Sequence, residues 1–104
     1  MPKLIISYKL KAGVTRETYE QWTRSVDYPS MRGLRRVSSF TNHRVRGLLM
    51  GPGAPSVDYV EVFEIADLDG FVTEDMPGAV VQKVMGDFMG FVDDPQFLVV
   101  DEVV

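Results

Sequence analysis

The sequence predicts one α+β domain, residues 1–104, with strands and helices in the order βαββαβ. Three observations support this prediction. Four segments are rich in β-branched and aromatic residues without helical spacing. Two segments between them carry apolar residues at helical intervals. The chain, at 104 residues, has the usual length of one domain and is short for two.

Local signals delimit the first strand and helix. Lys3–Leu10 is apolar on both parities, which is typical of a central strand covered on both faces. Thr15 can cap a helix, because its hydroxyl can accept from free N–H groups of the first turn. An apolar stripe follows at Tyr19, Trp22 and Val26. We expect Pro29 to end this helix, since it lacks an N–H and restrains the preceding residue.

A long loop separates the next two predicted strands. Leu34 to about Arg46 is interpreted as a strand that can contain a bulge. Gly47–Ser56 holds three glycines and two prolines and is therefore predicted as a loop, although Leu48–Met50 gives it an unusual apolar content. Val57–Ala66 alternates as a strand does, with two sets of side chains on opposite faces: Val60 and Val62 against Tyr59, Phe63 and Ile65.

The last third of the chain predicts a helix and a strand. Asp67 would cap a short helical segment, and Pro77 would be the first residue of the next helix. That helix has an apolar side formed by Val81, Val84, Met85, Phe88 and Val92. Close backbone packing would explain its Gly86 and Gly90. Asp93–Pro95 is predicted as a turn and Phe97–Val104 as the last strand.

This order is the ferredoxin-like, or split βαβ, plan. Both helices would cover one face of a four-stranded antiparallel sheet. Because the strands carry apolar residues on both parities, the other face would leave a large apolar surface exposed. We therefore expect a homodimer that forms through the sheet face.

Composition excludes several classes of function. The net charge of −4 argues against a nucleic-acid partner, which requires a surplus of Lys and Arg. Without cysteine there is no disulfide, thiolate metal site or thiol nucleophile. No apolar run reaches the roughly 20 residues that span a bilayer, and the N-terminal run is too short for a signal peptide. We expect a cytoplasmic protein without a membrane partner.

The single histidine, His43, is the first candidate for acid–base catalysis, because histidine titrates near neutrality. The alternative is a surface or hydrogen-bonded histidine at a strand end. Tyr8, Asn42 and Glu61 could be its polar neighbours, with Glu61 as a second catalytic group. A one-residue change of strand register would move any of these side chains to the other face.

No metal site is expected, since one histidine and scattered carboxylates resemble neither a zinc site nor a calcium loop. Several arginines give one region a positive potential: Arg32, Arg35, Arg36, Arg44 and Arg46. Arg44 could bind a carboxylate on a ligand, but such arginines more often form a solvated face or pair with acids such as Glu61 and Glu64 across the sheet.

Aromatic residues converge between the first helix and the sheet: Tyr8, Trp22, Tyr28, Phe40, Tyr59 and Phe63. Walls of this kind, with Trp22 and Tyr59 contacting substrate, suit a flat heteroaromatic ligand. They suit an ordinary core equally well, and Trp22 in particular fits a core position. No Gly-rich phosphate loop or nucleophile elbow occurs, so nucleotide and flavin cofactors have no support in the sequence.

Four segments carry a resemblance to a known family: Met1–Leu10, Thr15–Trp22, Ser38–His43 and Asp58–Ile65. Through them, and over the whole chain, the sequence resembles the RedY-like family of the dimeric α/β-barrel superfamily. The resemblance implies a ferredoxin-like monomer, a homodimer and a cleft for a small ligand in each subunit. It also implies a place in prodigiosin biosynthesis, on the branch that makes the methoxy-bipyrrole carbaldehyde, and no cofactor.

These considerations lead to one functional hypothesis and two alternatives. The hypothesis is a cofactor-independent enzyme that acts on a pyrrole or bipyrrole intermediate by a ring-forming condensation with loss of water. His43 would move the proton, and Arg44 would hold a carboxylate of the intermediate. The alternatives are a non-catalytic protein that binds or carries the intermediate, and a structural subunit of a biosynthetic complex.

Overall fold

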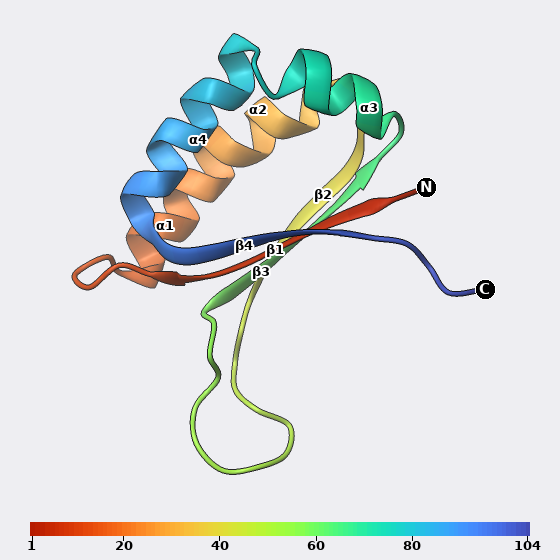
Figure 1. Ribbon diagram of the computed structural model, residues 1–104. Helices are drawn as coiled ribbons and strands as arrows, with labels where there is room; N and C mark the ends of the chain where they lie inside the picture. Colours follow the sequence, from red (N-terminus) through yellow and green to blue (C-terminus); the bar gives the residue numbers. More distant parts are fainter.

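The computed structural model describes residues 1–104 as a sheet with helices on one face (Figure 1). The elements are β1 (Lys3–Leu10), α1 (Arg16–Trp22), η1 (Thr23–Asp27), α2 (Tyr28–Arg32), β2 (Val37–Arg44), β3 (Tyr59–Ile65), α3 (Leu68–Gly70), η2 (Phe71–Asp75), α4 (Ala79–Phe91) and β4 (Val92–Val100). All strand pairs are antiparallel, in the order β2-β3-β1-β4. The predicted ferredoxin-like α+β fold is confirmed.

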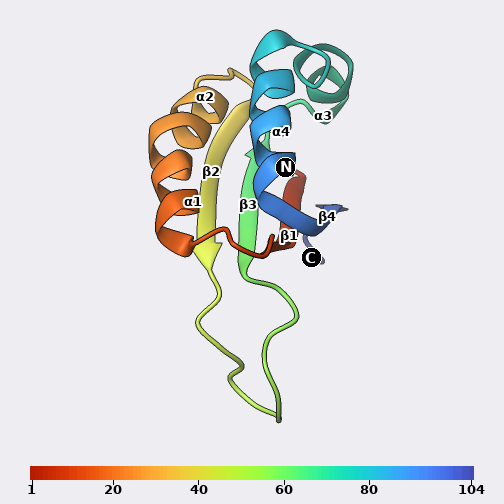
Figure 2. The same ribbon diagram turned by 90° about the vertical axis from the view of Figure 1, so that its left-hand side faces the viewer.

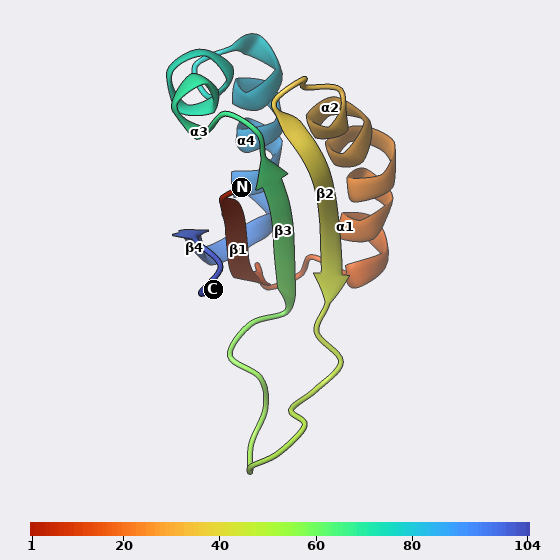
Figure 3. The same ribbon diagram turned by 90° about the vertical axis from the view of Figure 1, so that its right-hand side faces the viewer.

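Strand register decides which side chains face the helices. In β3 every second residue, Tyr59, Glu61, Phe63 and Ile65, is buried on the helix side, and Val60 and Val62 alternate with them on the other side, as predicted. Ile6 of β1 pairs with Glu61. The inner face of the sheet is therefore largely apolar, and its polar side chains include Glu61 of β3 and, from β2, Asn42 and Arg44, which pair with Glu61 and Tyr59. The outer face is not covered by any element of the chain (Figure 3).

One prediction about the first helix was wrong. Thr15 caps α1 as expected, since its hydroxyl accepts from the N–H of Thr18 at 3.2 Å. Pro29, however, does not end the helix, which runs through η1 and α2 to Gly33. The turn η1 is a π-helical turn, in which Tyr28 donates to the carbonyl of Thr23. This wider turn accommodates Pro29, because it relieves the clash that a proline ring makes in a regular α-helix.

The second helical region also differs from the prediction in detail. Asp67 caps α3 as expected, through a hydrogen bond from the N–H of Gly70. Pro77 lies in a turn, and α4 begins only after Gly78. A Cβ at Gly86 would meet nothing within 4 Å, and the same holds for Gly90. Close packing of α4 therefore does not explain these two glycines.

The edge strands differ from the prediction at their ends, and β4 begins earlier than expected, at Val92, so that the predicted turn Asp93–Pro95 is wrong. Leu34–Arg36 lies in the turn before β2, and the expected bulge falls between Val37 and Ser39. Asp93–Pro95 lies inside β4 as an irregularity opposite β1, with Asp94 at φ 52°, and β4 ends at Val100. Gly47–Ser56 is a loop that projects beyond the sheet (Figure 2).

None of the helices has the length and apolar character required to cross a lipid bilayer.

Candidate functional site

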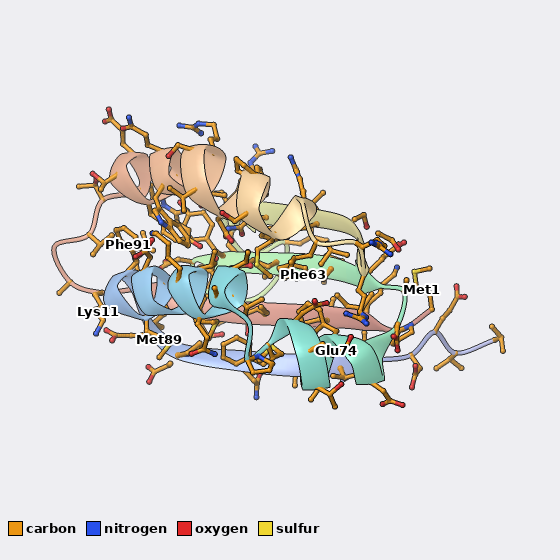
Figure 4. The ribbon with its side chains drawn as sticks, turned by 90° about the horizontal axis from the view of Figure 1, so that it is seen from above. Met1, Lys11, Phe63, Glu74, Met89 and Phe91 are labelled. Atoms are coloured by element: carbon orange, nitrogen blue, oxygen red, sulfur yellow. The ribbon has the colours of Figure 1, made fainter.

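An apolar cavity of about 220 Å³ lies between the inner face of the sheet and the helical layer. Fourteen of its sixteen lining residues are hydrophobic, and four of these are phenylalanines: Phe63, Phe71, Phe88 and Phe97. Figure 4 shows Phe63 in the middle of the molecule, between the α1–α2 segment and α4 as seen from the helix side. Val72 and Val99 line the same cavity and are more than half exposed, so its mouth lies between η2 and β4.

Glu61 is one of only two polar residues in this cavity, and it is 3% exposed. The Tyr8 hydroxyl donates a hydrogen bond to its Oε2 at 2.5 Å. Burial, together with the negative charge of Asp27, raises the pKa of Glu61 to about 8, and the Tyr8 and Tyr19 hydroxyls act in the opposite direction. Glu61 is thus a carboxyl group that can be either protonated or ionised near neutral pH.

Asp27 is the other polar lining residue, and it is also 3% exposed. It is the last residue of η1, so the π-helical turn positions it against the cavity; such turns often occur at functional sites. Its carboxyl group makes no hydrogen bond within the protein, although most buried polar groups make at least one. Burial raises the pKa of Asp27 to about 7, opposed by the charge of Arg32.

Behind Glu61 lies a network of hydroxyl and amide groups. The Tyr8 and Tyr19 hydroxyls are hydrogen-bonded to each other, and the Asn42 amide nitrogen donates to both, at 3.0 and 3.2 Å. Asn42 is held in turn because its backbone N–H donates to the Tyr28 hydroxyl at 2.8 Å. The network fixes the position of Tyr8 and therefore the orientation of the Glu61 carboxylate.

A separate polar cleft of about 230 Å³ lies between the first helix and β2, with Asn42 in its lining. In this cleft the Arg44 guanidinium donates to both oxygens of Glu20, at 2.6 and 2.7 Å, and the Tyr59 hydroxyl donates to Glu20 Oε2 at 2.6 Å. These contacts, led by the hydrogen bond from Arg44, lower the pKa of Glu20 to about 2. The fork of Arg44 is thus already occupied by a carboxylate of the same chain.

The structure brings some predicted site residues together and separates others. Glu61, Tyr8 and Asn42 form one hydrogen-bonded group beside the cavity, while Arg44 and Tyr59 belong to the polar cleft. Trp22 is half-buried against Phe91, at 5.3 Å between ring centroids, and its indole N–H donates to Asp87 at 3.2 Å. Trp22 does not line the cavity.

His43 faces the other side of the sheet from the cavity. It pairs with Val60 of β3, whose side chain lies on the outer face, and it is exposed. Its Nε2 is 2.9 Å from the Thr41 hydroxyl, on the same face. The proton-transfer role predicted for His43 stays a prediction, and the cavity holds acid–base groups without it.

Sequence reasoning did not find Asp27, although a signal was present. The buried residues of the first helix recur every four positions, at Tyr19, Thr23, Asp27 and Met31. An acidic residue on the buried stripe of a helix is unusual unless it is paired or functional. The predicted stripe followed regular helical spacing through Tyr19, Trp22 and Val26, and the π-helical turn instead buries Thr23 and Asp27, so Asp27 was not recognised as part of the buried side.

The arrangement defines a class of protein: a ferredoxin-like α+β chain with a pair of buried carboxyl groups in an apolar cavity. Two carboxyls whose pKa values lie near neutrality can exchange protons with a bound molecule as general acid and general base. No cluster of three or more side chains suited to holding a metal ion is present.

Comparison with known proteins identifies the family. The family model described as "REDY-like protein HapK" matches residues 2–103, so the chain belongs to this family. The resemblance predicted from the sequence is therefore confirmed. None of the curated proteins matches the chain.

Solved structures with the same fold extend beyond this family. HapK from Hahella chejuensis is 24% identical, with a TM-score of 0.78 and coverage of 99% of this chain and 93% of HapK. An EthD-family protein from Bacillus halodurans is 16% identical, with a TM-score of 0.78 and 99% of each chain covered. A protein from Thermobifida fusca, described as dimeric and ferredoxin-like and of unknown function, is 14% identical, with a TM-score of 0.73 over 95% of this chain and 88% of that chain.

Proposed function

We propose that the protein is an acid–base enzyme whose catalytic groups are Glu61 and Asp27. One observation carries this proposal: both carboxyl groups are 3% exposed and face a cavity that is otherwise apolar. Two acids in such a place lower the stability of the folded protein, because an ionised carboxylate there loses its hydration. Groups kept at that cost are candidates for a function. Their pKa values of about 8 and about 7 suit proton transfer at neutral pH.

The reaction that we propose is a ring-forming condensation with loss of water. In the first step an N–H group of the substrate adds to a carbonyl carbon of the same molecule, and the proton that the nitrogen loses passes to the carbonyl oxygen, which becomes a hydroxyl group. Protonated Glu61 donates its proton to a hydroxyl group of the substrate, the C–O bond breaks, and water leaves. Ionised Asp27 removes a proton from the adjacent atom, and a double bond forms. A proton then passes from Asp27 to Glu61, which restores the starting state. Tyr8 holds Glu61 in place through its hydrogen bond to Oε2.

The substrate that we propose is a pyrrole or bipyrrole intermediate of prodigiosin biosynthesis, on the branch that makes the methoxy-bipyrrole carbaldehyde. Membership of the HapK family supports the pathway. The phenyl rings of Phe63, Phe71, Phe88 and Phe97 support a flat aromatic ligand, since rings pack well against rings. A carboxylate held by Arg44 is not part of the proposal, because Glu20 occupies that guanidinium.

The main rival is a protein that binds the same intermediate without changing it. The apolar cavity serves either role, but only the enzyme requires a titratable group at Glu61. We expect Glu61→Gln to lower the rate of ring closure of the uncyclised pyrrole precursor by at least about 100-fold, the usual contribution of a general acid. Product formation is measured by chromatography with purified protein, and binding of the precursor by calorimetry.

The matched control is Glu17→Gln, which changes an exposed glutamate in the first turn of α1. The control variant should retain wild-type turnover. If Glu61→Gln binds the precursor and forms product at the wild-type rate, Glu61 is not catalytic. If the wild-type protein binds the precursor but forms no product, the carrier function replaces the enzyme.

We also propose that two copies pair through the outer face of the sheet. This face carries apolar side chains from three strands, Ile5, Val60, Val62 and Leu98, of which Leu98 is 42% exposed. Covering them would remove apolar surface from water. The Thermobifida fusca protein is described as dimeric, which supports the pairing of two copies.

A further inference from the structure

The polar groups of the cavity are acceptors or acids, and none carries a positive charge. No lysine, arginine or histidine is among the sixteen lining residues. Asp27 is 3% exposed, lines the cavity and makes no side-chain hydrogen bond within the protein; its oxygens are not among the fully enclosed atoms without a partner, so they remain accessible from the cavity. An unpartnered buried carboxyl group calls for a donor from a bound molecule. An anionic ligand would instead be repelled whenever either acid is ionised.

The apolar part of the cavity is also suited to positive charge. Four phenyl rings line it, and the faces of aromatic rings attract cations, more strongly when water is excluded. Two carboxyls alone are too few to replace the six or more oxygen ligands that a calcium ion prefers. The shape and the lining therefore fit an organic cation with an apolar body better than a metal ion.

We infer that the cavity binds a small organic monocation, whose proton-bearing nitrogen donates to Asp27 and Glu61 and whose apolar body packs among the phenyl rings. This inference rests on the same site as the proposed function and names the charge state of the ligand. It also fits the proposed reaction, since loss of water from a carbon that bears nitrogen leaves a positively charged C=N group. Stabilising that charge would accelerate the step.

The charge of the site depends on pH through a limited set of groups. In addition to burial, the negative charge of Asp27 raises the pKa of Glu61, and the hydroxyl groups of Tyr8 (β1) and Tyr19 (α1) lower it. Burial raises the pKa of Asp27, and the positive charge of Arg32 in α2 lowers it. The side chains that η2, α4 and β4 contribute to the cavity are apolar. Cation binding should therefore strengthen as the pH rises through the range in which the two carboxyl groups ionise.

The test uses three probes of similar shape: benzylammonium, benzyl alcohol and benzoate, titrated into the full-length protein by NMR. We expect benzylammonium to bind at least about tenfold more tightly at about pH 8 than at about pH 5.5, which corresponds to about one pKa unit of coupling. Benzyl alcohol should bind more weakly and without this pH dependence. Benzoate should not bind at about pH 8.

Three variants locate the effect. Asp27→Asn should remove most of the pH dependence, and Phe97→Leu should weaken binding of the cation more than that of the alcohol. Asp93→Asn, which removes an exposed carboxylate paired with Lys11 outside the cavity, should behave as wild type. If Asp27→Asn does not fold, as judged by its thermal unfolding, the wild-type pH series and Phe97→Leu still decide the question.

Equal affinity for the alcohol and the cation, binding of benzoate, or no binding of benzylammonium at about pH 8 would overturn the inference. These outcomes are separable from failure of the proposed function. If the cation binds in a pH-dependent way but Glu61→Gln retains turnover, the inference stands and the catalytic role of Glu61 is refuted. If turnover depends on Glu61 but the cation does not bind, the catalytic role stands and the inference is refuted.

Discussion

Replacing Glu61 by glutamine should make the protein less sensitive to alkaline pH. The pKa of Glu61 is raised from 4.5 to about 8 in the folded state, chiefly by burial. A group whose pKa is raised on folding stabilises the folded state most below its unfolded value, and this contribution is lost as the pH rises towards the folded value. Wild-type stability should therefore fall between about pH 5 and about pH 8.

The size of this loss follows from the two pKa values. The interval of three pH units, from about 5 to about 8, lies almost wholly between them, and each unit corresponds to about 1.36 kcal/mol. Glu61 alone should thus cost on the order of 4 kcal/mol of unfolding free energy across this interval, as an upper value. Glutamine does not ionise and can still accept the hydrogen bond from Tyr8.

Urea unfolding at fixed protein concentration measures the difference, with Trp22 as the fluorescent probe. At about pH 5 the variant and the wild type should have similar stability, because wild-type Glu61 is then protonated. At about pH 8 the variant should be more stable by a few kcal/mol. If the two stability curves run parallel across this interval, Glu61 does not have the raised pKa on which the catalytic proposal depends.

Two further changes test the packing and the proposed dimer. Gly86→Ala should stabilise the protein by up to about 1 kcal/mol, because Gly86 lies in α4 with open space around it. Gly70→Ala should lower the melting temperature, since its Cβ would lie 2.2 Å from Asp67 Oδ2. A lower melting temperature for Gly86→Ala, or a higher one for Gly70→Ala, in calorimetry would contradict this account. Val62→Lys on the outer sheet face should shift the protein to a monomer in size-exclusion chromatography with light scattering, whereas Val80→Lys on the exposed side of α4 should not; a monomeric wild type would refute the dimer.

Several features could be predicted from the sequence because they depend on neighbours along the chain. The strand Lys3–Leu10, the cap at Thr15 and the cap at Asp67 follow from alternation and from side chains that reach their own backbone. The alternation in β3 also placed Val60 and Val62 opposite Tyr59 and its partners. The order of these elements was sufficient to predict the ferredoxin-like fold.

The end of the first helix could not be predicted in the same way. Pro29 disfavours a regular helix, but a π-helical turn of five residues, packed on the sheet, allows the helix to continue. That turn places Asp27 in the cavity. The predicted start of the second helix was also displaced: α4 begins after Gly78 rather than at Pro77.

The βαββαβ order, the candidate status of Glu61 and the family resemblance were determined by the sequence itself. Only the tertiary structure decided which sheet face each strand residue occupies, because that depends on the register between strands distant in the sequence. It placed Glu61 beside Tyr8 and Asp27 and placed His43 on the opposite face. The raised pKa values have the same origin, since burial by the assembled layers, rather than any local motif, removes water from the two carboxyl groups.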